Sequence, residues 1–320
     1  MSGMEVVEGV HRIEAEVGGR PLYLFLFLGE RRLLLDAGCA SSIARFVVPS
    51  LAQLGLDLED LDLLVVTHSD LDHQGGVHAL KAANPGLLVS CGAADVPLVA
   101  DPEALVMGRY DAFRADHGIG YDDETLRWMR EESGKSEPVE IGLTGGESIR
   151  LGPGWQLSVL HVPGHSPGHL ALFDSRSGAL FSGDCVQGSV YLGLDGTPKL
   201  CPTYTDVDPY LETVAKIEAL EPRELHGSHW PAARGDGVRS FLAETRGYVE
   251  QIDELVRGSL TEPATLQDLI DRVNSRLEGP WPDGPAQELV YSLHGHAERL
   301  VEQGLATRDR SRPVVYRSSA

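Results

Sequence analysis

Short apolar runs separated by turn residues dominate the first ninety positions of the chain. Runs at 10–13, 22–28 and 33–35 have the length of strands, and Gly18-Gly19 and Gly29-Glu30 stand between them as turns. Apolar residues at helical spacing predict a helix over 41–54, and the continuous apolar run 63–66 is typical of a buried strand. A helix over 76–83 and a strand over 87–90 follow. The pattern predicts an α+β domain.

Residues 95–136 break this alternation, because the segment is charged, contains aromatic residues and is helical only in part. We interpret it as an insertion that either caps a functional site or packs on the surface without touching a substrate. Regular patterns then return, with strands at 147–150, 156–160, 170–173 and 179–182, a loop over 187–208, and helices over 209–220 and 240–256.

The C-terminal part, from about residue 259, has a different pattern. Two amphipathic helical stretches, over 266–277 and 289–301, precede two short apolar runs around a basic turn. Two helices and a hairpin predict a winged-helix-like module. We therefore divide the chain into a domain of residues 1–256 and a C-terminal domain of residues 257–320. The C-terminal part is nearly neutral in charge, which favours docking or homodimer formation over DNA binding.

Composition and charge narrow the possible partners. The chain has 320 residues and a formal net charge of −21, which argues against general nucleic-acid binding. Its four cysteines include no CxxC pair, which favours a reducing compartment. The first residues lack a signal-peptide core, and the most apolar run, 22–28, is too short to span a bilayer. We expect a cytoplasmic protein that acts on a small molecule.

Residues 67–76, THSDLDHQGG, carry the strongest chemical signal. They follow the predicted buried strand 63–66 and supply His68, Asp70, Asp72 and His73 within six positions. Nitrogen and oxygen donors packed this closely suit zinc, iron or manganese. The following Gly75-Gly76 would let the backbone turn sharply and start a helix close to the site. The loop predicts a metal site.

Three later segments offer further donors. Residues 161–169, HVPGHSPGH, form a rigid turn that can present His165. Asp184 ends the predicted strand 179–182 with a carboxylate, and the segment 225–230 contains His226 and His229. We prefer His229 to His226 as a ligand. For His161, His169 and His226, packing or hydrogen bonding to a ligand is the favoured interpretation, and for Cys185 it is a buried thiol.

These four motifs, in this order, resemble the signature of the metallo-β-lactamase superfamily, and their Pro-Gly-His-Ser-Pro-Gly-His form resembles its glyoxalase II-type branch. The resemblance covers about residues 6–256 and implies a four-layer αββα sandwich. It also implies two divalent metal ions, with zinc expected first and iron or manganese as alternatives. The ligands that it implies are His68, Asp70 and His165 for the first ion, Asp72, His73 and His229 for the second, and Asp184 as a bridge.

One residue departs from the family pattern: Asp70 stands where the HxHxDH motif has its second histidine. An aspartate oxygen has about the same reach as the histidine Nδ1, so Asp70 can still bind a metal. The change adds a negative charge and a harder donor, which favours iron or manganese. The alternative is that Asp70 is a weak ligand and leaves the first site partly empty.

The resemblance implies a dinuclear hydrolase in which a metal-bridging hydroxide attacks an ester, thioester, lactone or phosphodiester. Asp72 would orient this nucleophile, and Tyr191 or Lys199 could supply an oxyanion donor or a proton. Two alternatives remain. The first is a non-haem iron oxidoreductase of the persulfide dioxygenase or flavodiiron type, and the second is a ligand-sensing protein without enzymatic activity.

Overall fold

Two β-sheets form the centre of the molecule in the computed structural model, which describes residues 4–319. Seven strands of the described chain make the first sheet, in sequence order, with β1 to β4 antiparallel and β4 to β7 parallel. These strands are β1 (Met4–Val7), β2 (Val10–Val17), β3 (Arg20–Leu28), β4 (Arg32–Leu35), β5 (Leu63–Val66), β6 (Leu88–Gly92) and β7 (Ile141–Leu143).

The second sheet has the order β15-β14-β11-β10-β9-β8, and its neighbours are antiparallel except for the parallel pair β11 and β14. Its strands are β8 (Ser148–Gly152), β9 (Trp155–His161), β10 (Leu170–Asp174), β11 (Ala179–Gly183), β14 (Glu224–Gly227) and β15 (Ala233–Arg234). The two sheets face each other across an apolar cluster that includes Phe27, Val65, Leu157 and Phe181.

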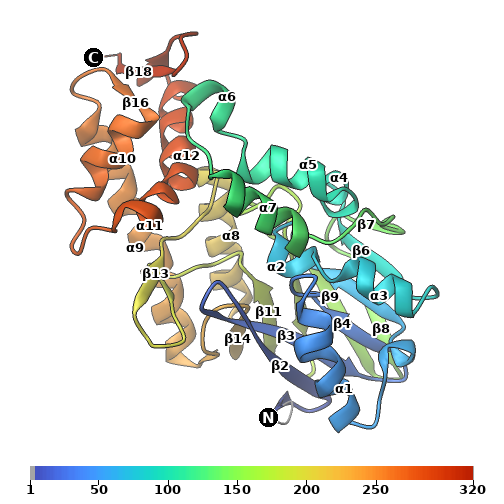
Figure 1. The fold of residues 1–320 in the computed structure, drawn as a ribbon. Coiled ribbons are helices and arrows are strands. Elements are labelled where there is room, and N and C mark those ends of the chain that lie inside the picture. The colour runs from blue at the N-terminus through green and yellow to red at the C-terminus, as the bar shows by residue number, and fades with distance from the viewer. Residues whose placement is uncertain (1–3, 320) are drawn as a thin grey trace.

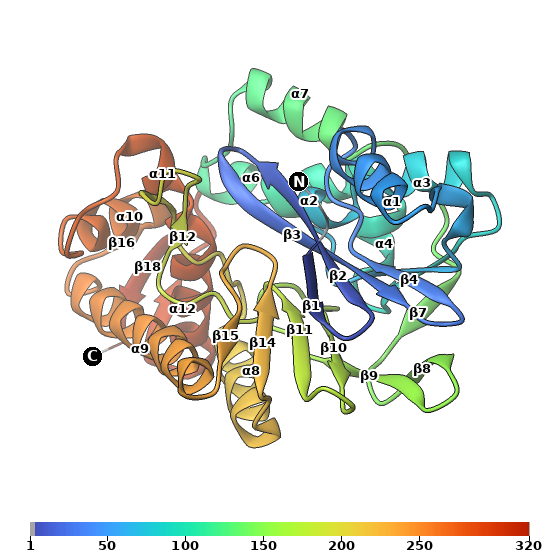
Figure 2. The ribbon, with the colours of Figure 1, turned by 90° about the horizontal axis from the view of Figure 1, so that it is seen from below.

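Helices cover the outer face of each sheet (Figure 2). A π-helical turn at Ile43–Val47, α1 (Val48–Gln53) and α3 (Val77–Ala83) pack on the first sheet, and a 3₁₀ turn, Leu58–Asp60, precedes β5. On the other side, α8 (Val207–Leu220) and α9 (Asp236–Ser259) pack on the second sheet. The predicted four-layer αββα sandwich is confirmed. No helix among residues 4–319 combines the length and the apolar character needed to cross a bilayer.

The insertion is helical in part, as predicted, with short helical segments separated by turns and coil. It contains α4 (Val96–Ala100), α5 (Pro102–Leu105), a π-helical turn at Val106–Tyr110, α6 (Arg114–His117) and α7 (Asp123–Glu132). Leu126 and Met129 of α7 are buried with the apolar side chains under the first sheet. In contrast, Phe113 and Ile119 are buried with the C-terminal helices. The insertion therefore joins the sandwich to the C-terminal part (Figure 1).

The C-terminal elements have the predicted order of helices followed by a hairpin. They are β16 (Ala264–Thr265), α10 (Leu266–Asn274), α11 (Asp283–Gln287), α12 (Leu289–Glu302), β17 (Ala306–Arg308) and β18 (Val315–Ser318), and the three strands form a sheet of order β16-β18-β17. The division after residue 256 stays a prediction, and α9 runs through it without a break. Tyr248, Ile252 and Val256 of α9 are buried among the C-terminal helices.

Candidate metal centre

Four strands end at one edge of the sandwich, and three predicted ligands, together with Asp36, lie just beyond those ends. Asp36 follows β4, His68 follows β5, Asp184 follows β11 and His229 follows β14. His165 lies in the turn between β9 and β10. Because both sheets present these ends to the same edge, segments more than 150 residues apart in the chain meet in one site.

The loop after β5 leads directly into a short helix, α2 (Leu71–Gln74). The expectation that Gly75-Gly76 allow a sharp backbone turn was wrong. Both glycines have ordinary helical φ angles, −57° and −77°, so no sharp turn requires them. Instead, a Cβ on Gly76 would lie 2.4 Å from the carbonyl oxygen of Ala37, and one on Gly75 would lie 2.0 Å from that of Glu132. The glycines allow the backbone of the metal loop to pack against its neighbours.

Asp36 contacts the loop at two points, the backbone of Thr67 and the ring of His73. It is a buried residue with a φ of 64°, and its carboxylate accepts a hydrogen bond from the Thr67 backbone N–H at 2.7 Å. The other carboxylate oxygen lies 2.9 Å from His73 Nδ1. Burial opposes a charged His73, but the carboxylates of Asp36, Asp72 and Asp184 raise its pKa to about 10. Asp36 thereby directs His73 Nε2 towards the site, and an ion bound there must displace a proton.

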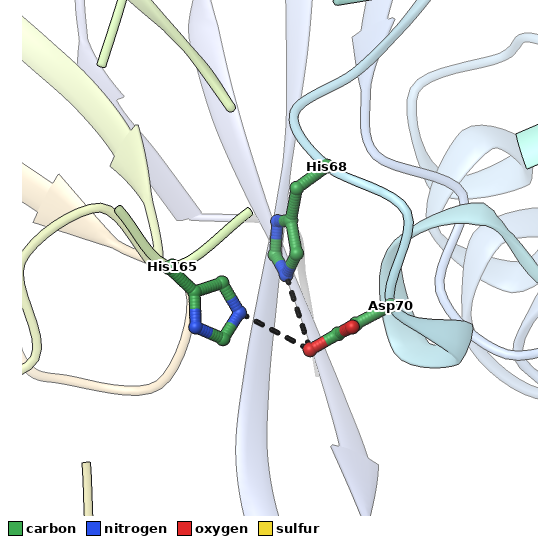
Figure 3. A group of neighbouring side chains, drawn as sticks. All are labelled: His68, Asp70 and His165. Carbon is green, nitrogen blue, oxygen red and sulfur yellow. Dashed lines mark hydrogen bonds and ion pairs between the residues drawn. The ribbon is translucent and has the colours of Figure 1, made fainter. Parts of the chain in front are cut away.

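The first predicted ligand set, His68, Asp70 and His165, does meet (Figure 3). Asp70 Oδ2 lies 3.1 Å from His165 Nε2 and 3.7 Å from His68 Nε2. Burial, together with the neighbouring histidines, holds the pKa of His68 well below its usual value. His68 is therefore a neutral imidazole, the form that binds metals.

The second predicted set also meets. His229 Nε2 lies 3.3 Å from Asp72 Oδ2 and 3.4 Å from Asp184 Oδ2, and His73 Nε2 lies 3.9 Å from both Asp72 Oδ1 and Asp184 Oδ1. His229 Nδ1 lies 2.7 Å from the Pro21 carbonyl, to which it donates, so that Nε2 faces the site with its lone pair. Burial disfavours the ionised form of Asp72, but His73, His229 and Arg20 lower its pKa well below the usual value.

Three buried polar atoms at the centre have no hydrogen-bond partner within the described residues: His68 Nε2, His73 Nε2 and Asp184 Oδ1. These three residues lie close enough together to hold one ion. His68 belongs to the first predicted set, His73 belongs to the second, and Asp184 is the predicted bridge. Leaving such atoms unpaired would cost about 1–3 kcal/mol each. Imidazole nitrogens and a carboxylate are the donors that borderline divalent cations prefer. The residues therefore fit the implied metal ions.

Arg109, from the insertion, is a site residue that the sequence interpretation missed. Its Nε lies 3.0 Å from Asp70 Oδ1 and its Nη2 lies 3.2 Å from Asp70 Oδ2. Burial would raise the pKa of Asp70, but the charge of Arg109 and the contact with His165 hold it well below its usual value. Nothing in the sequence pairs positions 70 and 109, although the charged insertion gave a general indication.

The other predicted residues occupy varied positions. Tyr191 is buried, and its hydroxyl donates a hydrogen bond to Asp184 Oδ2 at 2.9 Å. It lies on the short strand β12 (Tyr191–Leu192), which pairs with β13 (Pro198–Leu200). Lys199, on β13, is exposed. The structure does not bring Lys199 to the metal-site residues. His169 accepts a hydrogen bond from the Asp184 backbone at 3.1 Å, which agrees with its predicted role of supporting a ligand. Cys185 is a buried free thiol.

A cavity of about 260 Å³ opens onto the centre. Asp70, Asp72, Asp184 and His229 form its floor. The remaining walls come from the β2–β3 hairpin, the insertion and the C-terminal part, through Arg20, Tyr110, Tyr121, Trp128, Met129, Glu288 and Tyr291 among others. The insertion thus contributes directly to the cavity. Burial raises the pKa of Glu288, which accepts a hydrogen bond from Tyr121 at 2.6 Å.

The model of one protein family, described as the metallo-beta-lactamase superfamily, matches residues 18–229 of the chain. The chain belongs to the metallo-β-lactamase superfamily. The matched range contains the complete ligand set proposed for both ions, from His68 to His229.

Within the superfamily, the chain is similar to several metallohydrolases. It is 31% identical to a hydroxyacylglutathione hydrolase of Cupriavidus taiwanensis over 258 residues, which cover 74% of this chain and 81% of that protein. It is also 31% identical to the human acyl-coenzyme A thioesterase MBLAC2 over 170 residues, and this match spans about half of each protein, 51% and 52%.

Solved structures of superfamily members share the fold. A metallo-beta-lactamase family protein from Thermus thermophilus superposes with a TM-score of 0.77 at 22% identity, covering 98% of this chain and 99% of that one. A beta-lactamase domain protein from Burkholderia ambifaria gives a TM-score of 0.75 at 20% identity, covering 99% and 93%. Since these matches extend over nearly the whole chain, the likeness in fold includes the C-terminal elements.

Proposed function

We propose that this protein is a dinuclear metal-dependent hydrolase and that a thioester is the first substrate class to test. The observation that carries the proposal is the set of three buried donor atoms without partners, His68 Nε2, His73 Nε2 and Asp184 Oδ1, of which Asp184 also lines the cavity. Most buried polar atoms in native proteins have a hydrogen-bond partner, so three unpaired donor atoms on neighbouring residues call for a ligand. Here two divalent cations would account for all three.

The ligand sets are proposed as the sequence predicted them. His68, Asp70 and His165 would hold one ion, Asp72, His73 and His229 would hold the other, and Asp184 would contact both. When bound, such ions supply Lewis-acid activation of water and of the carbonyl or phosphoryl oxygen of the substrate.

The chain's own residues set up this chemistry. Asp72 is ionised and lies on the cavity wall, so it can accept a hydrogen bond from a nucleophilic water and orient it. Burial raises the pKa of Tyr191 well above its usual value, so its hydroxyl keeps its proton and donates to Asp184. Gln187 Nε2 in turn donates to the Tyr191 hydroxyl at 2.7 Å. We therefore assign Tyr191 the role of positioning Asp184, which differs from the oxyanion donor expected from sequence.

The relatives support a thioester among the four bond types considered. One relative is named an acyl-coenzyme A thioesterase and another a hydroxyacylglutathione hydrolase, and both names describe hydrolysis of an acyl group from a thiol carrier. The cavity also has the apolar wall that an acyl chain needs, formed by Leu71, Trp128 and Met129.

The second candidate is an iron oxidoreductase, and Asp70 is the residue that favours it. Its carboxylate adds a hard donor, which suits iron. However, Arg109 compensates the added charge, so the electrostatic part of this argument is weaker than the sequence suggested. Turnover that requires oxygen, with iron in the site, would identify this activity.

The decisive experiment is elemental analysis of the purified protein combined with turnover of acyl-coenzyme A and acylglutathione thioesters on the same sample. We expect about two ions per chain and cleavage that stops when a chelator removes them. Asp184→Asn should lose both metal and turnover. His78→Gln is the matched control, because His78 pairs with Glu137 at 2.7 Å and belongs to none of the ligand sets. Undiminished thioester cleavage by metal-stripped protein would contradict the proposal.

A further inference from the structure

The β2–β3 hairpin carries a cation to the edge of the metal centre. Arg20 is the first residue of β3, after the turn Gly18-Gly19. The next residue, Pro21, accepts the hydrogen bond of His229 through its carbonyl, and Tyr23 N–H donates to the Ser228 carbonyl at 2.8 Å. At the tip of the hairpin, Gly19 accepts a hydrogen bond from Leu194 N–H at 2.9 Å. These contacts fix the position of Arg20 relative to the proposed ligand His229.

The Arg20 side chain lines the same cavity as Asp72, Asp184 and His229. Its guanidinium carbon lies 6.0 Å from the centre of the Tyr191 ring, at the outer limit of a cation–π contact. Arg20 therefore points along the wall that leads to the metal ligands, and not out into solvent from the hairpin.

Among residues 4–319, Arg20 has no ion pair and no side-chain hydrogen bond, and its buried Nε is unpartnered. The other arginine of the cavity, Arg109, is bidentate to Asp70 and also donates to the Thr203 carbonyl at 3.3 Å. Burial acts to raise the pKa of two cavity carboxyls, Asp72 and Glu288, and the charge of Arg20 acts to lower both, without an ion pair to either. Asp72 belongs to the proposed metal ligands, and Glu288 accepts a hydrogen bond from Tyr121. The cavity thus holds one arginine that is structural and one that is available to a ligand.

We propose that Arg20 binds an anionic group of the substrate, a carboxylate or a phosphate, while the scissile bond lies at the metal centre. A guanidinium presents parallel N–H donors that match either anion in a bidentate geometry. This inference rests on the proposed hydrolase function and adds a substrate class to it: an acyl compound that carries a second, negatively charged group. The partly apolar wall opposite, with Trp128 and Met129, would contact the chain between the two groups.

Calorimetry with simple acids tests the site without requiring turnover. Butyrate, and the dicarboxylates succinate, glutarate and adipate, are titrated into metal-loaded protein. One carboxylate of each probe can engage the metal centre, and only the dicarboxylates offer a second one to Arg20. We expect at least one dicarboxylate to bind about tenfold or more tightly than butyrate. Arg20→Gln should abolish this preference and leave butyrate binding unchanged, and Arg20→Lys should retain part of it.

Arg31→Gln is the matched control, because Arg31 is exposed just beyond the opposite end of the same strand. 4-Phosphonobutyrate, in which a phosphonate replaces one carboxylate of glutarate, distinguishes the two anions. If Arg20→Gln loses more affinity for 4-phosphonobutyrate than for glutarate, the bound group is a phosphate. If it loses less, the bound group is a carboxylate. Absence of a dicarboxylate preference in the wild type, or its survival in Arg20→Gln, would overturn the assignment. The same samples separate this inference from the proposed function, since thioester cleavage without any anion preference removes only the role of Arg20.

Discussion

The guanidinium of Arg109 contacts both carboxylate oxygens of Asp70, at 3.0 and 3.2 Å. The guanidinium carbon also lies 4.5 Å from the centre of the Tyr291 ring on α12. One side chain of the insertion therefore joins the metal loop to the C-terminal helices. It also compensates the negative charge that Asp70 adds relative to a histidine. The geometry makes Asp70 and Arg109 one paired unit at the candidate metal centre.

The neighbouring residue His165, a proposed ligand, belongs to the same network. Thr203 N–H donates to Gln187 Oε1 at 3.0 Å, which orients the amide so that Nε2 faces His165 Nδ1 at 2.9 Å. His165 Nδ1 then accepts, and the ring hydrogen lies on Nε2, towards Asp70. For His165 Nε2 to hold an ion, this hydrogen would have to move to Nδ1 and the Gln187 amide would have to turn so that its oxygen accepts it.

Removing the guanidinium tests whether Asp70 is a metal ligand. Arg109→Gln leaves a buried carboxylate uncompensated, so we expect the metal-free protein to lose about 3–5 kcal/mol of stability. In the metal-loaded protein the loss should be smaller, because an ion bound to Asp70 compensates the charge. Thermal unfolding with and without metal measures both values. An equal loss in the two states would show that Asp70 does not bind the ion, and Asp70→Asn with Arg109→Gln should recover part of the metal-free loss.

A substitution at Asp36 tests whether its carboxylate orients the His73 ring, without changing any proposed metal ligand. Asparagine also adopts the left-handed conformation that Asp36 shows, so Asp36→Asn should keep the fold. It removes the charge that fixes His73, and we expect metal affinity to fall about 10- to 100-fold. Competition with a chromophoric chelator measures the change. Asp62→Asn is the control, because Asp62 accepts a hydrogen bond from the Arg32 backbone outside the site. Unchanged affinity in Asp36→Asn would refute the orienting role.

Gly76 tests the packing explanation for the glycines of the metal loop. In Gly76→Ala, the new Cβ would meet the Ala37 carbonyl oxygen and the Ile43 side chain, at 2.4 and 2.7 Å. We expect a loss of several kcal/mol, by analogy with overpacking of a core, which typically costs about 1–3 kcal/mol. Gly247→Ala on α9 is the opposite case: nothing lies within 4 Å of its Cβ, so a gain of about 0.5–1 kcal/mol is expected. Similar unfolding midpoints for both variants would disprove the explanation.

The sequence predicted what depends on strand ends and local motifs. His68, Asp184 and His229 each lie within two residues of the end of a strand, so the strands and the candidate ligands could be read from hydrophobic runs and short motifs, and the sandwich followed from the family that those motifs resemble. The partners Arg109, Gln187 and Arg20 were not predicted, because each lies on a segment whose path depends on tertiary packing. The glycine pair shows a related limit: its presence was readable, but its reason lies in the backbone of Ala37, a residue distant in the sequence.

A pH-dependent contact holds α9 to α12. Asp253 on α9 lies 3.2 Å from His296 Nδ1 and accepts from Arg299 Nη1 at 3.1 Å and from Arg257 Nε at 2.6 Å. The hydrogen bond with His296 is the largest cause that lowers the pKa of Asp253, and it outweighs partial burial. Because the folded-state pKa lies below the unfolded value, the contact stabilises the protein fully above the unfolded pKa, about 3.9, and its contribution falls as pH drops below that value.

Asp253→Asn should therefore cost about 1.5–3 kcal/mol at neutral pH, the range expected for hydrogen bonds to a charged group. The difference from the wild type should stay constant between pH 7 and 5 and narrow below about pH 4, because the carboxylate takes up a proton in the unfolded wild-type chain while it stays ionised in the folded one. Urea unfolding of metal-free protein across this range measures it without interference from ion release. Asp283→Asn, at an exposed position on α11, should show no difference at any pH. A gap that persists unchanged to pH 3 would mean that Asp253 acts through packing and not through its charge.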